Sequence, residues 1–145
     1  MEVTVSSPYE SADLLMKLYD LRREATMREA RTWFFREFNP SSVDDLVGAV
    51  MGPHSGHFRM VTSYWDMAAS FVANGAIDEK MFNDANGEQV GVFAKIEPFL
   101  AEYRTKMNNP NYLTNLEQMV LRRPGAREMI AAFRERLRGV ASAGR

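Results

Sequence analysis

The sequence contains no cysteine, which excludes disulfide bonds, thiolate nucleophiles and thiolate metal ligands. It contains only two histidines, His54 and His57, in a glycine-rich segment. A metal site needs further ligands of fixed geometry, and the Glu-x-x-His pair of di-metal helical bundles is absent. We therefore expect no metal centre and interpret the two imidazoles as exposed loop side chains.

Long apolar runs are also absent. No stretch approaches the roughly 18 consecutive apolar residues of a membrane span, and residues 1–7 have neither the basic nor the apolar region of an export signal. Residues 87–91 contain two glycines, but the lysine and the strand-to-helix context of a phosphate-binding loop do not follow them. We expect a cytoplasmic protein with no membrane span and no cofactor.

The composition is that of one globular domain, because 145 residues with 46% hydrophobic and 26% charged residues suffice for a single core. Residues 1–7 and 141–145 are expected to be flexible. The net charge of −1 hides an uneven distribution. Residues 37–118 hold eleven acidic and five basic residues, a net −6, whereas residues 122–145 hold seven arginines and two glutamates, a net +5.

Apolar residues at helical spacing predict an all-α fold, a bundle of about six or seven helices with a long N-terminal helix. Its start is marked by Ser7–Glu10, where Ser7 can cap and Pro8 fits the first helical position. Continued to Phe38, this helix would be about 45 Å long, against a diameter near 38 Å for a compact domain of this length. It therefore either kinks or overhangs. An overhang would favour a dimer contact through its aromatic end, although we favour core packing for Trp33, Phe34, Phe35 and Phe38.

The most amphipathic segment, residues 57–74, is predicted to be the central helix. Residues 88–107 predict another long helix, which contains Pro98 on the face opposite its apolar stripe, so we expect a bend there and not a break. Shorter helices are predicted over residues 42–51, from Asp78, over residues 112–120 and from Pro124. No alternating strand pattern and no internal repeat is present.

Residues 64–78 read Tyr-Trp-Asp-Met-Ala-Ala-Ser-Phe-Val-Ala-Asn-Gly-Ala-Ile-Asp, and the apolar helix over residues 93–104 and the pair Leu116-Glu117 follow them. Together with the earlier run over residues 21–30, these segments resemble an uncharacterised bacterial helical family known as domain of unknown function 4760. The resemblance extends over residues 18–121. It implies a helical fold and a bacterial source, and it transfers no catalytic residue.

Glu117 is the one carboxylate that is predicted to lie among apolar side chains of its own helix. An unpaired charge there would be costly and would have a raised pKa. One interpretation is a half-buried ion pair with Arg104 or Arg59. The other is a perturbed acid that lines a pocket with Arg104 and Tyr64. We favour the ion pair, because no nucleophile or base lies nearby in sequence. Asp66, on the polar side of the central helix, is interpreted as solvated or in an ordinary ion pair.

Four arginines of the C-terminal segment lie within about 60° of one another on a helical wheel: Arg123, Arg127, Arg134 and Arg138. This stripe borders the apolar face, which suits arginine stems that cover the edge of the core. We favour pairing with the acidic middle of the chain, within one molecule or between subunits. The alternative is an external anionic partner such as nucleic acid, which the pI of about 6.1 disfavours.

The absence of a catalytic constellation favours a non-enzymatic helical module that acts through protein contacts and self-associates, as a homodimer or with another protein. Two alternatives stay open. One is an all-α enzyme or small-ligand protein with a pocket near Glu117. The other is a weak nucleic-acid binder that uses the arginine-rich last helix.

Overall fold

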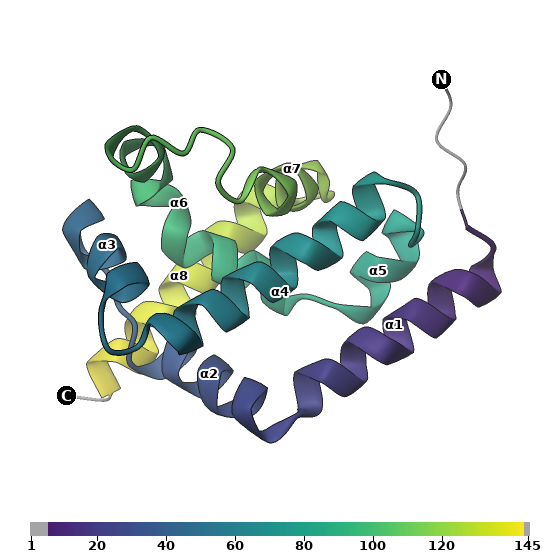
Figure 1. Ribbon diagram of the computed structural model, residues 1–145, viewed down its shortest axis with the longest axis horizontal. Coiled ribbons are helices and arrows are strands. Elements are labelled where there is room, and N and C mark those ends of the chain that lie inside the picture. Colours follow the sequence, from purple (N-terminus) through teal and green to yellow (C-terminus); the bar gives the residue numbers. More distant parts are fainter. Residues whose placement is uncertain (1–5, 144–145) are drawn as a thin grey trace.

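The computed structural model describes residues 6–143, with side chains as far as Gly139, and these residues form eight α-helices and no strand (Figure 1). The helices are α1 (Pro8–Arg23), α2 (Ala25–Arg36), α3 (Val43–Met51), α4 (Ser55–Ala73), α5 (Glu79–Ala85), α6 (Glu88–Lys106), α7 (Thr114–Arg122) and α8 (Ala126–Ala143). The all-α prediction is confirmed. No described helix is long and apolar enough to cross a membrane. The ends expected to be flexible lie mostly outside the described residues.

The long N-terminal helix is interrupted and not continuous, so of the two alternatives, a kink or an overhang, the structure shows an interruption that divides it into α1 and α2. It starts as predicted, with Ser7 and Glu10 forming a reciprocal capping box. It ends at Arg23, because Glu24 has an extended backbone (φ −59°, ψ 143°) and its carboxylate accepts a hydrogen bond from the Met27 amide at 3.0 Å. This break separates α1 from α2 and explains why the described residues form eight helices where about six or seven were predicted.

The central helix is α4, which runs through the middle of the molecule and contacts α2, α3, α6 and α7 (Figure 1). One face of α4 is buried along its whole length, from Phe58 through Trp65 to Val72. Against it pack the aromatic residues of α2 and its C-terminal end: Trp33, Phe34 and Phe38 are at most 8% exposed. Core packing of these three rings is therefore confirmed, and the partly buried Phe35 packs against the same core.

The second long helix, α6, continues through Pro98 without a break. Proline has no N–H, so the carbonyl four residues earlier, that of Ala94, loses its helical hydrogen bond. Arg134 of α8 donates its Nε–H to that carbonyl at 3.1 Å. A side chain from the last helix therefore replaces the helical donor that the proline lacks. This bond ties α8 to the middle of α6.

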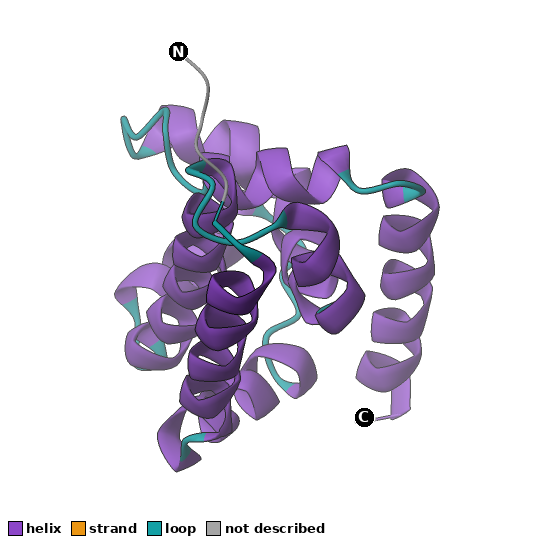
Figure 2. Cartoon of the chain, turned by 90° about the vertical axis from the view of Figure 1, so that its right-hand side faces the viewer, coloured by secondary structure: helices purple, strands orange, loops and turns teal. Residues whose placement is uncertain are grey.

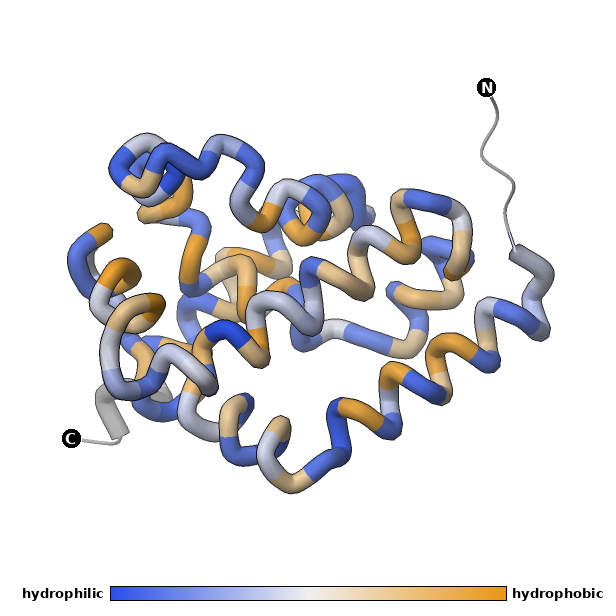
Figure 3. Tube along the Cα trace, in the orientation of Figure 1, coloured by the Kyte–Doolittle hydropathy of each residue, from blue (hydrophilic) through white to orange (hydrophobic). Residues whose placement is uncertain are grey.

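Helix α1 lies along the edge of the molecule, where it packs against α2 and α5 (Figures 1 and 2). Only Ser11 and Leu18 of its sixteen residues are buried. Hydrophobic and hydrophilic segments alternate along the helix in Figure 3. The exposed hydrophobic residues of α1 are Tyr9, Met16, Tyr19 and Leu21.

Candidate functional site

The structure places Glu117 of α7 and Arg104 of α6 together. Arg104 Nη1 lies 3.1 Å from Glu117 Oε1, and the side chains are 17% and 28% exposed. The Nε and Nη2 groups of Arg104 both donate to the carbonyl of Tyr112, at 2.9 and 2.7 Å. The guanidinium therefore fixes the connector between α6 and α7 while it neutralises Glu117. This geometry corresponds to a half-buried structural ion pair.

The other two members of the predicted pocket lie elsewhere. Tyr64 is buried against α1, where its hydroxyl donates to the Leu18 carbonyl at 2.7 Å, and burial raises the pKa of Tyr64 to about 12. Arg59 is exposed and lines two pockets, one of about 660 Å³ together with Tyr64 and one of about 630 Å³ together with Asp66 and Tyr112. Neither Glu117 nor Arg104 lines either pocket. The structure therefore brings Tyr64 and Arg59 together but leaves the Glu117–Arg104 pair outside their pocket, so the four residues do not form one site.

Asp66 has a role that differs from our interpretation of it as solvated or ion-paired. Its carboxylate accepts a hydrogen bond from the Leu116 amide at 2.9 Å. Leu116 is the third residue of α7, and the first amides of a helix have no partner within it. Leu113, which precedes α7, makes no side-chain cap. Asp66 therefore caps α7 from a different helix, and this long-range contact has no local sequence signal.

The arginine stripe faces acceptors of the same molecule. Arg123 donates to the carbonyls of Asn86 and Asn83 at the end of α5. Arg127 and Arg134 both contact Glu97, at 2.8 and 2.9 Å. Together with the bond from Arg134 to Ala94 described above, these contacts hold α8 and the α7–α8 turn against α5 and α6.

The last member of the stripe, Arg138, pairs with Glu135 on its own helix. Both side chains are mostly exposed, at 67% and 75%, so this pair contributes little to stability. Arg138 is thus the one arginine of the four whose described partner lies on α8 itself.

The two histidines lie at the start of α4, with His54 at its N-cap and His57 within its first turn, so His57 is not a loop residue. Both imidazole rings lie next to the Trp33 ring, and the centroids of His54 and His57 are 5.0 and 6.1 Å from the Trp33 centroid. No group of three or more acidic, histidine or cysteine side chains in the described part of the chain could hold a metal ion.

One partly buried and one buried charged residue were not singled out from the sequence. The first is Glu88, in the first turn of α6, which accepts from Arg31 of α2 in a bidentate pair at 2.7 to 3.0 Å and from the Trp65 indole at 3.2 Å. The second is Lys95 of α6, which is 7% exposed and donates to backbone carbonyls at the end of α2. Burial lowers the pKa of Lys95 to about 8.

The local sequence gives one signal for such groups. Residues 90–96 are apolar around the whole helix except for Lys95, and a helix that is apolar on all sides is buried. A lysine in such a helix is buried with it, and its ammonium group therefore needs hydrogen-bond acceptors or a carboxylate nearby.

The fold and its polar contacts define an all-α protein in which several described charged side chains, among them Arg104, Asp66 and Glu88, join helices by ion pairs and caps. Residues 9–123 match the family described as domain of unknown function (DUF4760). Because this match covers most of the 145 residues, the chain belongs to that family. No curated protein and no solved structure matches the chain.

Proposed function

We propose that this protein is a helical interaction module that forms a homodimer through the outer face of α1. The observation that carries the proposal is a strip of α1 residues at heptad spacing, turned away from the core. Tyr9, Ala12, Met16, Tyr19 and Arg23 lie within about 80° of one another on a helical wheel, and all five are exposed.

The strip is apolar where a surface helix is normally polar. Tyr9, Met16 and Tyr19 are 88%, 64% and 46% exposed. The spacing of three and four residues is that of the contact positions in paired helices. Exposed hydrophobic residues are ordinary when scattered singly, but a continuous strip along one helix is typical of a contact surface.

The charges of α1 favour a second copy in antiparallel orientation. Residues 8–15 carry two acidic groups, Glu10 and Asp13, and residues 16–23 carry three basic groups and one acidic group. The halves therefore have net charges of −2 and +2. An antiparallel pair places each half opposite its complement, whereas a parallel pair places like charges together.

The side chains also fit this orientation. With the twofold axis at Met16, each Met16 faces its equivalent, and the small Ala12 faces Tyr19 of the second copy. Tyr9 then faces Arg23 of the second copy, an aromatic ring opposite a guanidinium. The face of α1 is about 24 Å long, which is less than a standard interface of roughly 800 Å² per partner requires. We therefore expect a dissociation constant in the micromolar range.

Sedimentation velocity between roughly 1 µM and 1 mM tests the proposal. We expect a reversible monomer–dimer equilibrium that Met16→Lys abolishes. Met51→Lys is the matched control, because Met51 is 67% exposed at the end of α3, away from the strip. Wild-type protein that stays monomeric over this range would contradict the proposal, as would equal loss of dimer in both variants. The bacterial source and the cytoplasmic location stay predictions from the sequence.

A further inference from the structure

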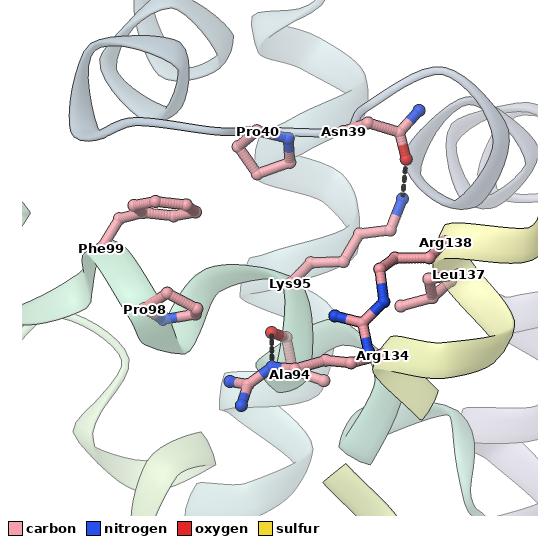
Figure 4. Close-up of a pocket in the computed structure, with 9 residues that line it drawn as sticks. All are labelled: Asn39, Pro40, Ala94, Lys95, Pro98, Phe99, Arg134, Leu137 and Arg138. Carbon is pink, nitrogen blue, oxygen red and sulfur yellow. Dashed lines mark hydrogen bonds between the residues drawn. The ribbon is translucent and has the colours of Figure 1, made fainter. Parts of the chain in front are cut away.

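A small pocket of about 220 Å³ lies where α6, α8 and the segment after α2 meet (Figure 4). Lys95 and Phe99 come from α6, Leu137 and Arg138 from α8, and Asn39 from the segment after α2. In Figure 4 the Lys95 side chain extends toward Asn39, and the Arg138 guanidinium points toward Lys95 and Ala94. Arg134 also lines the pocket, so three cationic residues border it.

Lys95 has an evident structural role, but that role occupies only part of its hydrogen-bonding capacity. An ammonium group has three N–H donors. Two of them serve the carbonyls of Phe34 and Phe38, at 2.8 and 2.5 Å, which satisfies the C-terminal end of α2. The third is shared between the Phe35 carbonyl and Asn39 Oδ1, both at 3.3 Å. These two long contacts are weak enough for a stronger acceptor to replace them.

The charge around the pocket is positive. Among the described residues, no carboxylate lies within ion-pair distance of Lys95, and its neighbours are neutral acceptors. Glu97 is shared between Arg127 and Arg134, so one carboxylate balances two guanidinium groups. The Arg138–Glu135 pair is exposed and therefore exchanges easily with solvent or with another anion.

The remaining wall is apolar. Phe99 and the ring of Pro40 lie across the pocket from the Arg138 guanidinium, and Leu137 lies beside Arg138 on α8 (Figure 4). A bare inorganic anion would leave this wall unfilled. A small monocarboxylate with an apolar body matches both the positive side and the apolar side.

We propose that this pocket binds a small organic monocarboxylate, with its carboxylate on Lys95 Nζ and the Arg138 guanidinium and its apolar body against Phe99 and the ring of Pro40. One carboxylate oxygen replaces Asn39 Oδ1 at the third N–H of Lys95. The other accepts from Arg138, which turns from Glu135. This site does not depend on the α1 interface, so the two proposals fail separately.

The probe is benzoate, which is titrated into the full chain while two-dimensional ¹H–¹⁵N NMR spectra are recorded. Benzamide serves as the neutral analogue. We expect benzoate to shift the amide signals of Asn39, Lys95 and Leu137 in a saturable way and benzamide to bind at least roughly tenfold more weakly. Arg138→Gln should weaken benzoate binding by roughly tenfold, because it removes one charge-assisted hydrogen bond.

Arg136→Gln is the matched control. Arg136 lies two residues away on α8 and does not line the pocket, and its guanidinium lies over the Phe133 ring. The change removes the same charge from the same helix. Equal weakening in both variants would show a general charge effect and overturn the proposal. Absence of saturable shifts at these three amides, or equal binding of benzamide, would also overturn it. Because Arg138 is exposed, Arg138→Gln leaves the fold intact and keeps the test decisive.

Discussion

Glu88→Gln is expected to destabilise the protein by about 2 to 3 kcal/mol, although the substitution hardly changes the size of the side chain. Glu88 accepts two donors of Arg31 and the indole N–H of Trp65, and the Arg31 and Glu88 side chains are 28% and 18% exposed. A hydrogen bond to a charged group contributes about 1.5 to 3 kcal/mol. Breaking a fully buried pair costs about 3 to 5 kcal/mol, and the partial exposure of this pair lowers that figure.

The variant also leaves the Arg31 guanidinium half-buried without its carboxylate. Arg31→Met removes that charge, so the double variant should be more stable than the sum of the single losses predicts, by about 1 to 2 kcal/mol. Urea unfolding at neutral pH, followed by circular dichroism and by tryptophan fluorescence, gives all four free energies of the cycle. A loss below about 0.5 kcal/mol in Glu88→Gln, or strictly additive effects, would refute this account of how α2, α4 and α6 are joined.

Three further changes test separate contacts by unfolding free energies. Gly91→Ala places a Cβ 3.0 Å from two ring atoms of Phe133, so it should destabilise the protein by a net of about 1 kcal/mol. Gly139→Ala places its Cβ in open space and should stabilise the protein by up to about 1 kcal/mol. Stabilisation by both substitutions would contradict the close packing at Gly91. Asp66→Ala removes the cap of α7 and should cost about 1 kcal/mol at neutral pH, and no measurable loss would contradict the capping role. Between pH 8 and 10.5 the folded protein loses the Lys95 proton while the unfolded chain keeps it. The unfolding free energy of the wild type should therefore rise by about 2 to 3 kcal/mol over this range relative to that of Lys95→Met. A difference between the two unfolding free energies that does not change with pH would count against a lowered pKa of Lys95.

The sequence predicts those parts of the fold that depend on local signals. The capping box at Ser7 and the amphipathic pattern of α4 are both confirmed. The continuation of α6 through Pro98 is confirmed as well, and Arg134 supplies the hydrogen bond that the Ala94 carbonyl loses to the proline. A kink in the long first helix was one of two predicted alternatives, but its position at Glu24 was not predicted, since neither glycine nor proline lies near it and glutamate is an ordinary helix former. That break lets α2 bury its aromatic residues while α1 contacts α4 through the Tyr64 hydroxyl.

The candidate sites depend on contacts between distant segments, and the sequence resolves these only where few partners are available. Arg104 was one of two candidates for Glu117, and the structure pairs them. Asp66 and Lys95 instead form hydrogen bonds with backbone groups 50 and 57 to 61 residues away. Because every residue carries such a backbone group, the sequence does not indicate which one a side chain will contact. The apolar pattern of α4 also contains Met67, which remains 39% exposed, so periodicity identifies an apolar stripe without showing which part of it is covered.

Cysteine cross-linking tests the proposed antiparallel dimer most directly, and the natural absence of cysteine makes each introduced thiol unique. Met16 lies at the proposed twofold axis, so Met16→Cys should form an intermolecular disulfide rapidly under mild oxidation. Tyr9→Cys should form one slowly with itself and rapidly with Arg23→Cys, because antiparallel helices place these two positions together. No disulfide in Met16→Cys at concentrations of roughly 100 µM, or equally fast self-linking of Tyr9→Cys, would contradict the account.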